Sequence, residues 1–433
     1  MHRREFLGSI ALPAAAAVPL ACVPVLRHDA HERVRGLALD PRDPEDVARD
    51  ESFWFQVQQA FTPDRAMVNL NNGGVCPAPR VVQDAMKRYL DHANTAPAYV
   101  LWRVQDPEKE TVRAGLARLF GADPEEIAIT RNASESLENV QQGFDLERGD
   151  EIVTTTQDYP RMLTTWEQRE RREGIVLRKI VLPVPCEDPA EVVRRFAAAI
   201  TDRTRLLHMS HVINLTGQVL PVRDVVRMAR AKGIPVIVDG AHSFAHLDFA
   251  HADLDCDFYG TSLHKFLFAP HGTGMLFVRR EKIETLWPLM AAPKALDADI
   301  RKFEEIGTHP MANFLAIADA LTFHFGIGPA NKLARMLYLR DHWAKRLVQH
   351  PRVKLNTSLK PGFATGVCNV QIEGVDSIKL ADHLWNKHKL FTVAIVHDEF
   401  QGVRVSPAVY TTLGELDRFC DAMERVLRDG FPA

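Results

Sequence analysis

The stretch GTSLHKFLFAPHGTGML, residues Gly260–Leu276, places a lysine between His264 and Phe266 in one of the least charged parts of the chain. Lysine is rarely buried without a partner. Burial disfavours the charged ammonium, so a buried lysine loses its proton readily and becomes a nucleophile. We therefore interpret Lys265 as a candidate nucleophile, against the alternative of a solvent-exposed lysine at the start of a helix.

A second apolar stretch, VIVDGAH at Val236–His242, contains an acidic residue at its end. A carboxylate at the end of a buried strand needs a cationic partner, and Asp239 precedes Lys265 by 26 residues. Pyridoxal phosphate chemistry requires such a pair. The lysine forms a Schiff base with the cofactor aldehyde, and the aspartate keeps the pyridine nitrogen protonated so that the ring accepts electrons. Taken alone, each residue also fits a structural role, Asp239 as a cap and Lys265 as a surface side chain.

Strand-like and helical segments alternate through the middle of the chain. The strand candidates are Glu126–Thr130, Asp150–Thr156, Ile175–Leu182, Thr204–Val212, Ile234–Gly240, Cys256–Ser262 and Gly272–Arg280. This alternation predicts a parallel sheet covered by helices on both faces. Ligands bind at the carboxyl ends of strands in such sheets, and three segments rich in polar side chains follow Thr130, Val238 and Gly260. Further along, we expect a helical stretch over about Phe314–Gln349 and a last helix at Leu413–Arg428.

The composition bounds the class of protein. The chain has 433 residues, of which 46% are hydrophobic and 25% charged, and its net charge is −3. This is an ordinary soluble globular composition, with enough length for two domains. The near-neutral charge gives no reason to expect a nucleic acid or an anionic membrane as a partner. The 6 cysteines form no C-x-x-C pair and the 18 histidines follow no metal-ligand spacing, so we expect no metal site and interpret the cysteines as buried thiols.

The N-terminal stretch MHRREFLGSIALPAAAAVPLAC has a basic start, a short apolar middle and small residues at its end, as secretory signals do. Its Arg-Arg-x-Phe-Leu pattern resembles a twin-arginine export signal, and the apolar run is too short to span a bilayer. We expect a signal peptide at residues 1–26, an N-terminal arm and helix at residues 27–66, and no integral membrane segment in the mature protein. The expected export partner is the twin-arginine machinery. The expected location is periplasmic or exported, with lipid attachment at Cys22 as an alternative, and cytoplasmic if the signal is not functional.

The sequence resembles the class V branch of the pyridoxal-phosphate aminotransferase superfamily, and within it the isopenicillin N epimerase-like and cysteine-desulfurase-like proteins. The resemblance runs from Asn69 to the C-terminus and is carried, in this order, by TRNASESLENV, DYP, SHVINLTG, VDGAH, FYGTSLHKFLFAPHGTGML, EIGTHP and VRVSPAVYTT. It implies an α/β protein of fold type I. A large cofactor-binding domain, at residues 67–320, would hold a mostly parallel seven-stranded sheet covered by helices, followed by a smaller C-terminal α/β domain at residues 321–433. It also implies pyridoxal 5′-phosphate as the cofactor.

The resemblance and elementary chemistry together assign residues to the cofactor. The segment NASES follows a strand and opens a helix, and backbone N–H groups at a helix N-terminus favour a phosphate. Ala133 and Ser134 are therefore expected to hold the cofactor phosphate, with capping of the helix as the alternative role of this segment. Hydroxyl and imidazole donors near the lysine suit a phosphate dianion, and these are Thr261, Ser262 and His264. The resemblance further implies that Tyr159 stacks on the cofactor ring. The residues that it places on the side of the 3′-oxygen are Asn214, Thr216 and His242.

The resemblance also implies how the substrate is bound. Arg404 in VRVSP is expected to bind the substrate α-carboxylate, because a guanidinium pairs with a carboxylate through two hydrogen bonds. An arginine on a surface strand is the alternative. Asn71 and Asn72, before a Gly-Gly turn, are expected to line the substrate entrance. Thr308 in IGTHP corresponds to a threonine that reaches the phosphate of the partner subunit, so we expect a C2 homodimer with shared active sites.

The predicted catalytic residues are Lys265, Asp239 and His242, and Lys265 is the expected base at the Cα of an amino acid or an amino-acid-containing peptidic substrate. A cysteine desulfurase needs a mobile cysteine ahead of the carboxylate-binding arginine, and the stretch LFTVAIVHDEFQGVR has none. The expected function is that of an exported, isopenicillin N epimerase-like enzyme. The alternatives are a C–S lyase that releases its product freely, a periplasmic tailoring enzyme of a secreted peptide siderophore, and a non-catalytic amino-acid-binding protein. The sequence does not decide among transferase, epimerase and lyase chemistry.

Overall fold

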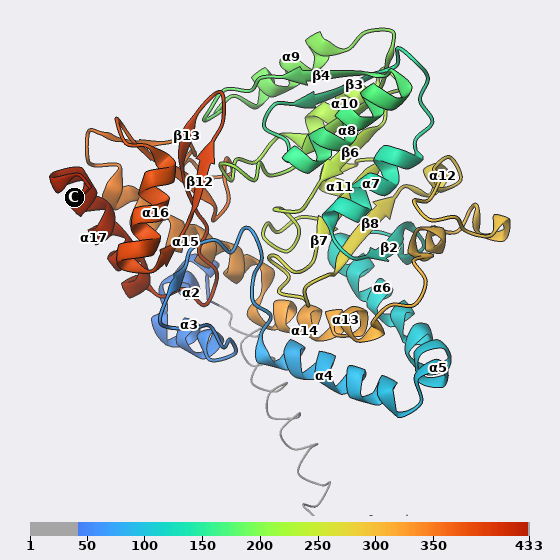
Figure 1. Ribbon diagram of the computed structural model, residues 1–433, viewed down its shortest axis with the longest axis horizontal. Helices are drawn as coiled ribbons and strands as arrows, with labels where there is room; N and C mark the ends of the chain where they lie inside the picture. The colour runs from blue at the N-terminus through green and yellow to red at the C-terminus, as the bar shows by residue number, and fades with distance from the viewer. Residues whose placement is uncertain (1–41, 432–433) are drawn as a thin grey trace, which may run out of the picture. The chain divides into compact units, whose positions relative to one another are not determined.

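A seven-stranded sheet lies at the centre of the larger part of the computed structural model, which describes residues 42–431 (Figure 1). The predicted signal peptide, Cys22 and the first part of the predicted arm lie outside the described residues. The strand order is β2-β8-β7-β6-β5-β3-β4. Neighbouring strands are parallel except at β8, which is antiparallel to both of its neighbours. The strands are β2 (Ile127–Thr130), β3 (Glu151–Thr155), β4 (Val176–Ile180), β5 (Thr204–Ser210), β6 (Val236–Asp239), β7 (Phe258–Ser262) and β8 (Gly274–Val278).

The mostly parallel seven-stranded sheet is confirmed, because each of these strands lies inside a segment predicted from the sequence. Its central strands are buried on both faces, which explains why they occur as continuous apolar runs. In β6, Val236 and Val238 pack into the hydrophobic core on one face, whereas Ile237 packs into a second core on the other. The sheet therefore has a helical layer on each side.

Different helices complete the two cores. Helices α7 (Ala133–Gly143) and α8 (Pro160–Glu173) cover the Ile237 face, and α6 (Asp106–Phe120) and α10 (Val222–Arg230) cover the opposite face. The other helices of this part are α4 (Arg80–Thr95), α5 (Pro97–Tyr99), α9 (Pro189–Ala199), α11 (His251–Leu254), α12 (Arg280–Ile283), α13 (Met311–Leu315) and α14 (Ile317–Ile327). A π-helical segment spans Val100–Gln105, and 3-10 turns span Pro124–Glu126, Lys294–Leu296 and Ile300–Glu304.

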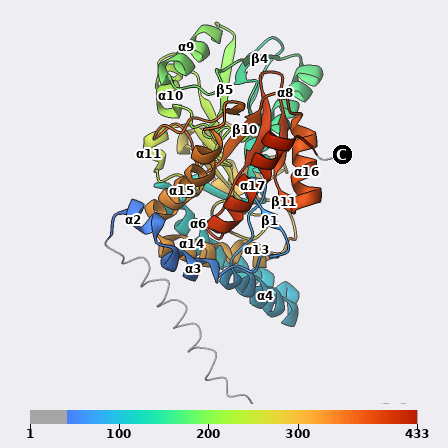
Figure 2. The same ribbon diagram turned by 90° about the vertical axis from the view of Figure 1, so that its left-hand side faces the viewer.

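A second, antiparallel sheet lies in the C-terminal part of the chain, with the strand order β12-β13-β10-β9. Helices α15 (Pro329–Leu347), α16 (Ser377–His388) and α17 (Leu413–Asp429) pack on it around Trp343 and Phe419 (Figure 2). Its strands are β9 (Val353–Leu355), β10 (Cys368–Ile372), β12 (Val393–Val396) and β13 (Gln401–Val405). Two short strands, β1 (Val68–Asn69) and β11 (Leu390–Phe391), form a separate parallel pair. The domain boundaries predicted from the sequence stay predictions.

The first described helices, α2 (Pro44–Arg49) and α3 (Glu51–Gln58), attach to α15. The guanidinium of Arg335, which is fully buried, donates to the carbonyl of Ala48 at 2.9 Å and forms an ion pair with Glu51 at 2.5 Å. This arginine therefore holds the N-terminal helices against the C-terminal part of the chain.

The helical stretch predicted over about Phe314–Gln349 is interrupted. Gly328 adopts a φ of 87°, and Pro329 follows it as the first residue of α15. Glycine tolerates a positive φ, and proline is favoured at the first position of a helix. The chain therefore bends by 75° at this point.

No single helix within residues 42–431 has the length and apolar composition of a membrane span. The bent pair Met311–Ile327 and Pro329–Leu347 meets these two criteria only when its members are combined.

Candidate active site

Lys265 lies in the loop after β7, and its amine contacts a histidine. Lys265 Nζ is 2.9 Å from Nε2 of His242. Burial lowers the pKa of the Lys265 amine to about 8; the charge of Asp239 opposes this shift, and that of Arg404 reinforces it. Part of the amine is therefore neutral near pH 8, as a nucleophile or a proton acceptor must be.

His242 is a neutral imidazole. Burial holds the pKa of His242 well below its usual range, and the charges of Lys265 and Arg404 act in the same direction. Nε2 of the neutral ring accepts the hydrogen bond from Lys265, so Nδ1 carries the proton. This buried Nδ1 has no partner among the described residues. A buried donor without a partner beside Lys265 suits a bound group.

Asp239 is the last residue of β6 and is 6% exposed. One carboxylate oxygen accepts a hydrogen bond from the backbone N–H of Ala241 at 2.9 Å, and the other has no hydrogen-bond partner within residues 42–431. Burial raises the pKa of this carboxyl, while the Ala241 N–H and the charge of Lys265 oppose the shift. A buried carboxylate with a free oxygen, close to the lysine, fits the predicted partner of a protonated pyridine nitrogen.

The start of α7 and the end of β7 meet at the predicted phosphate end of the site. Ser262 Oγ accepts a hydrogen bond from the backbone N–H of Ala133 at 2.9 Å. The side chain of Asn132 caps the helix by accepting from a backbone N–H at 2.9 Å. A Cβ on Gly274 would come within 2.7 Å of the Asn132 backbone, so the glycine permits this close approach. Ser134 follows Ala133 in the first turn and is partly exposed. The structure thus brings Ala133 and Ser262 together at a helix N-terminus, where a phosphate is favoured.

Two other predicted phosphate ligands form hydrogen bonds within the chain. The hydroxyl of Thr261 donates to the carbonyl of Gly240 at 3.0 Å. His264 Nδ1 lies 3.1 Å from the carbonyl of Thr273, and burial lowers the pKa of His264 to about 4. The neutral ring therefore donates from Nδ1 and keeps Nε2 as an acceptor, which suits a phosphate less well than a donor does. The phosphate roles of Thr261 and His264 stay predictions.

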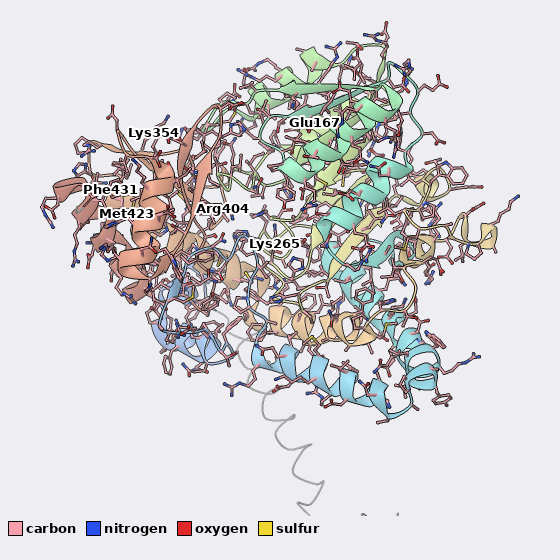
Figure 3. The ribbon with its side chains drawn as sticks, in the orientation of Figure 1. Glu167, Lys265, Lys354, Arg404, Met423 and Phe431 are labelled. Atoms are coloured by element: carbon pink, nitrogen blue, oxygen red, sulfur yellow. The ribbon has the colours of Figure 1, made fainter. Side chains whose placement is uncertain are left out.

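Arg404, on β13, reaches the site from the second sheet, and its charge acts on the Lys265 amine; both residues are labelled in Figure 3. Its guanidinium donates to the backbone carbonyl of Asn214 at 2.9 Å and to Oδ1 of Asn71 at 2.8 Å. It is 7% exposed, and within the described chain it has no carboxylate partner and its Nε has no hydrogen bond. Burial lowers the pKa of Arg404 to about 10, so the group is still a cation at neutral pH. An uncompensated buried cation suits a carboxylate ligand.

The remaining residues predicted to bind the substrate or the cofactor differ in whether their side chains already form hydrogen bonds within the chain. The amide of Asn72 donates to two backbone carbonyls at 3.0 Å and accepts from the hydroxyl of Tyr410 at 2.6 Å, so its hydrogen-bonding groups are engaged. Thr216 is fully buried. By contrast, the side-chain oxygen of Asn214 is buried without a partner in residues 42–431 and is available to a ligand.

Tyr159 stands at the start of α8, is 41% exposed, and lies within electrostatic reach of Arg404. The residue before it, Asp158, is one that the sequence did not single out. Its buried carboxylate accepts five hydrogen bonds of 2.7 to 2.9 Å, whose donors are the hydroxyl of Thr154 and the hydroxyl and backbone N–H of both Thr155 and Ser210. Asp158 therefore joins the ends of β3 and β5 next to Tyr159. The available signal was the run of three threonines at a strand end, two residues before this aspartate.

Thr308 is not brought to the other predicted residues within one chain. It is exposed and lines a separate hollow with Trp102, Arg301 and His309, and that hollow contains none of the other predicted site residues. Its predicted place in the site of a partner subunit stays a prediction.

Comparisons with known proteins agree with this geometry. The chain matches the family described as Aminotransferase class-V over residues 68–419. The isopenicillin N epimerase of Streptomyces clavuligerus is 32% identical over 388 residues, which cover 86% of this chain and 98% of that protein. The apo structure of a cysteine desulfurase from Thermococcus onnurineus NA1 is similar with a TM-score of 0.73 at 24% identity, covering 84% of this chain and 95% of that one. A complex of the cystine C-S lyase C-DES with cysteine persulfide has a TM-score of 0.72 at 22% identity, covering 82% and 97%.

The chain belongs to the class V aminotransferase family. Its fold is fold type I, as predicted, and it is a pyridoxal-phosphate-dependent enzyme. Its own residues fit this cofactor. They supply a lysine amine of lowered pKa, a buried carboxylate with a free oxygen, a helix N-terminus, and unpaired buried polar atoms on His242 and Asn214.

Proposed function

We propose that the protein is an isopenicillin N epimerase-like enzyme that acts at the Cα of an amino acid or an amino-acid-containing peptidic substrate. The observation that carries the proposal is that Arg404, a buried cation without a carboxylate partner in the described chain, acts through its charge on the partly neutral amine of Lys265. A carboxylate bound to Arg404 brings its α-carbon toward this amine. A protein that only bound amino acids would need the arginine but not a lysine of lowered pKa.

The chain's own groups divide the work at Cα. When bound, pyridoxal phosphate would supply an aldehyde and an electron-accepting ring for the chemistry at Cα. Arg404 binds the carboxylate, and Asn71 orients the guanidinium from 2.8 Å. Lys265 Nζ takes up the Cα proton, and His242 Nε2, 2.9 Å away, accepts a hydrogen bond from this amine and orients it. Asp239 is the carboxylate that would hold the protonated pyridine nitrogen of the cofactor.

The described cysteines are unsuited to a persulfide relay. All five are buried, and burial raises the thiol pKa of both Cys76 and Cys368 to about 12. The thiolate, rather than the thiol, is the nucleophile. The hairpin from β12 to β13, which leads to Arg404, contains no cysteine. These features favour an epimerase over a cysteine desulfurase. They keep a C–S lyase as the second candidate, because an enzyme that releases its sulfur product freely needs no acceptor thiol.

Solvent-isotope exchange tests the proposed function. The purified enzyme, loaded with pyridoxal phosphate, is incubated in D₂O with L-amino acids, D-amino acids and short peptides. Mass spectrometry measures deuterium at Cα, and chiral chromatography measures configuration. We expect deuterium to enter together with inversion, and K265A to slow exchange by about 10³-fold. Release of sulfide without inversion would instead assign the lyase. Binding of substrate without exchange would contradict the proposed action at Cα.

We also propose export by the twin-arginine route, which the sequence pattern at Arg3 and Arg4 supports and which lies outside the described residues. Replacing both arginines by lysine should keep the protein in the cytoplasm, whereas the natural sequence should yield a shortened periplasmic form. Cell fractionation and the mass of the mature N-terminus measure this. An exported enzyme would meet secreted peptidic metabolites such as siderophores. Unchanged culture supernatants from a deletion strain would contradict a role in tailoring them.

A further inference from the structure

A fully buried lysine contacts the loop that carries Lys265. Lys332, on α15, has no exposed surface and forms no ion pair with a carboxylate within residues 42–431. Its Nζ donates a hydrogen bond to the backbone carbonyl of Phe266 and lies 3.2 Å from Nδ1 of His324. The same ammonium lies 4.4 Å from the centre of the Phe268 ring. A buried lysine without a carboxylate is costly, so its contacts with this loop call for an explanation.

The backbone of loop 264–268 is strained and is held by contacts with two other segments of the chain. Phe268 has a φ of 61°, in the left-handed region that is unfavourable for a bulky side chain. Lys332 contacts this loop twice, at the carbonyl of Phe266 and at the ring of Phe268. The loop also accepts a hydrogen bond of 3.0 Å, at the carbonyl of His264, from the backbone N–H of Cys76. Strained backbone of this kind persists only where its surroundings hold it.

The contacts of Lys332 continue to His242. The ring of Phe266 stacks on the imidazole of His246, with 3.8 Å between the ring centres. Nδ1 of His246 donates to the backbone carbonyl of His242 at 3.0 Å, and Nε2 of His242 contacts Lys265 at 2.9 Å. These contacts thus connect Phe266, through His246 and His242, to Lys265, the residue that precedes Phe266 in the sequence. A shift of Phe266 would therefore displace both members of the pair formed by Lys265 and His242.

We propose that Lys332 is a positioning residue that holds Lys265 and His242 in their reactive arrangement through the backbone carbonyl of Phe266. This role rests on the proposed function of Lys265 as the lysine that binds the cofactor. Lys332 acts through Phe266 and contacts neither Lys265 nor His242 directly.

The titratable groups around Lys332 are His324 on α14, His246 and Cys76. Burial lowers the pKa of both histidines and raises the pKa of the thiol, so all three are neutral near pH 7. Burial also lowers the pKa of Lys332 to about 7. Lys332 is therefore the one group of this described cluster that can carry a charge near neutral pH.

Lys302 provides a matched control. It is 3% exposed, donates to two backbone carbonyls at 2.6 and 2.7 Å, and lies 5.2 Å from the centre of the Phe303 ring. These are the same kinds of contact that Lys332 makes, but none of them involves the loop that carries Lys265. Comparison of K332M with K302M therefore separates the general cost of losing a buried lysine from the loss of the anchor at Phe266.

The test measures the ionisation of Lys265 in the cofactor-free protein. The rate of reductive methylation of this amine is followed against pH by peptide mass mapping. The wild-type midpoint is expected near pH 8. K332M is expected to raise the midpoint by about one pH unit toward that of an ordinary lysine, because the released amine regains water. K302M should keep the wild-type midpoint, and so should K332R, which retains a side-chain N–H donor for the Phe266 carbonyl.

The outcomes distinguish the role of Lys332 from that of Lys265. A pyridoxyl adduct on Lys265 after borohydride reduction, together with an unshifted midpoint in folded K332M, would overturn the role of Lys332 alone. No adduct on Lys265 in the wild-type protein would overturn the proposed function. If K332M does not fold, K332Q replaces it. Its shorter amide cannot reach the Phe266 carbonyl as the ammonium does, so the same upward shift is expected, and an unshifted midpoint overturns the role.

Discussion

Among single residues, burial has moved the pKa values on which the proposed chemistry depends. Lys265 must be neutral to take a proton, and its pKa is lowered from 10.5 to about 8. Below that pH the ammonium dominates, so activity should rise from pH 7 to pH 9. In R404Q a neighbouring positive charge is lost, so the pKa of Lys265 should rise and the profile should move to higher pH. KM for a carboxylate substrate should increase about 10- to 100-fold. Values of kcat and KM between pH 6 and pH 10 measure both effects, and an unmoved profile would contradict the coupling of the two residues.

Asp158 gives a prediction about stability. Its two oxygens accept backbone N–H groups from opposite sides, those of Thr155 and Ser210, at 2.8 and 2.7 Å. An asparagine has only one acceptor oxygen, so in D158N one of these fixed N–H groups must face an amide NH₂. We predict a loss of about 1–3 kcal/mol in the free energy of unfolding, measured by urea denaturation. D145N, at an exposed aspartate, is the control and should stay within about 0.5 kcal/mol of wild type. Equal stability of the two variants would contradict this account.

The chemical identity of the site was predictable from the sequence, whereas the use of each side chain was not. Asp239 and Lys265 stand in apolar surroundings at strand ends, where charged groups are conspicuous. By contrast, Asn72 and Thr261 were expected to contact ligands, and the structure shows their hydrogen bonds within the chain. The partner of Asn72, Tyr410, is 338 residues away along the chain. A local pattern contains no information about such a partner.

Among the helices and strands, the buried parallel strands were the most predictable, because a strand that is apolar on both faces forms a short continuous run bounded by turns. The break between α14 and α15 was missed, although Gly328 and Pro329 are visible in the sequence. Apolar periodicity continues on both sides of the break, and periodicity alone does not show the positive φ of Gly328. The contacts of α2 with α15 could not be predicted from the sequence either, because they join segments that are far apart in the chain.

The hairpin from β12 to β13 gives a prediction about substrate binding. At its tip, Glu399 accepts hydrogen bonds from the side chain of Gln157, at 2.7 Å, and from the hydroxyl of Thr156. These contacts fix the hairpin that carries Arg404. E399Q replaces one acceptor by a donor, and we predict a rise of about 5-fold in KM, equivalent to roughly 1 kcal/mol, with little change in kcat. D398N, at the exposed neighbouring residue, is the control. Equal KM values for the two variants would show that the hairpin does not depend on Glu399.

Across the whole chain, the candidate site draws on both sheets. Lys265 and Asp239 come from the ends of strands in the seven-stranded sheet, and Arg404 comes from the four-stranded sheet. Contacts of Arg404 with Asn71 and Asn214 bring these parts together within one chain. Arg404 and Lys265 therefore belong to the same site of the same subunit. Thr308 is the predicted site residue that does not lie with the others within one chain.

If the protein is a homodimer with shared sites, Thr308 should serve the site of the partner subunit. K265A and T308E should each be inactive alone, the first without its lysine and the second with a carboxylate that repels the cofactor phosphate. In a mixed dimer, one site combines an intact Lys265 with an intact Thr308. Random exchange makes about half of the dimers mixed, each with one intact site, so about a quarter of wild-type activity should return. K265A mixed with R404Q is the control: both residues act in one chain, so the mixture should gain no activity beyond that of the separate variants. Exchange is verified with differently tagged subunits. If the mixture of K265A with T308E then gains no activity, Thr308 does not act across the interface.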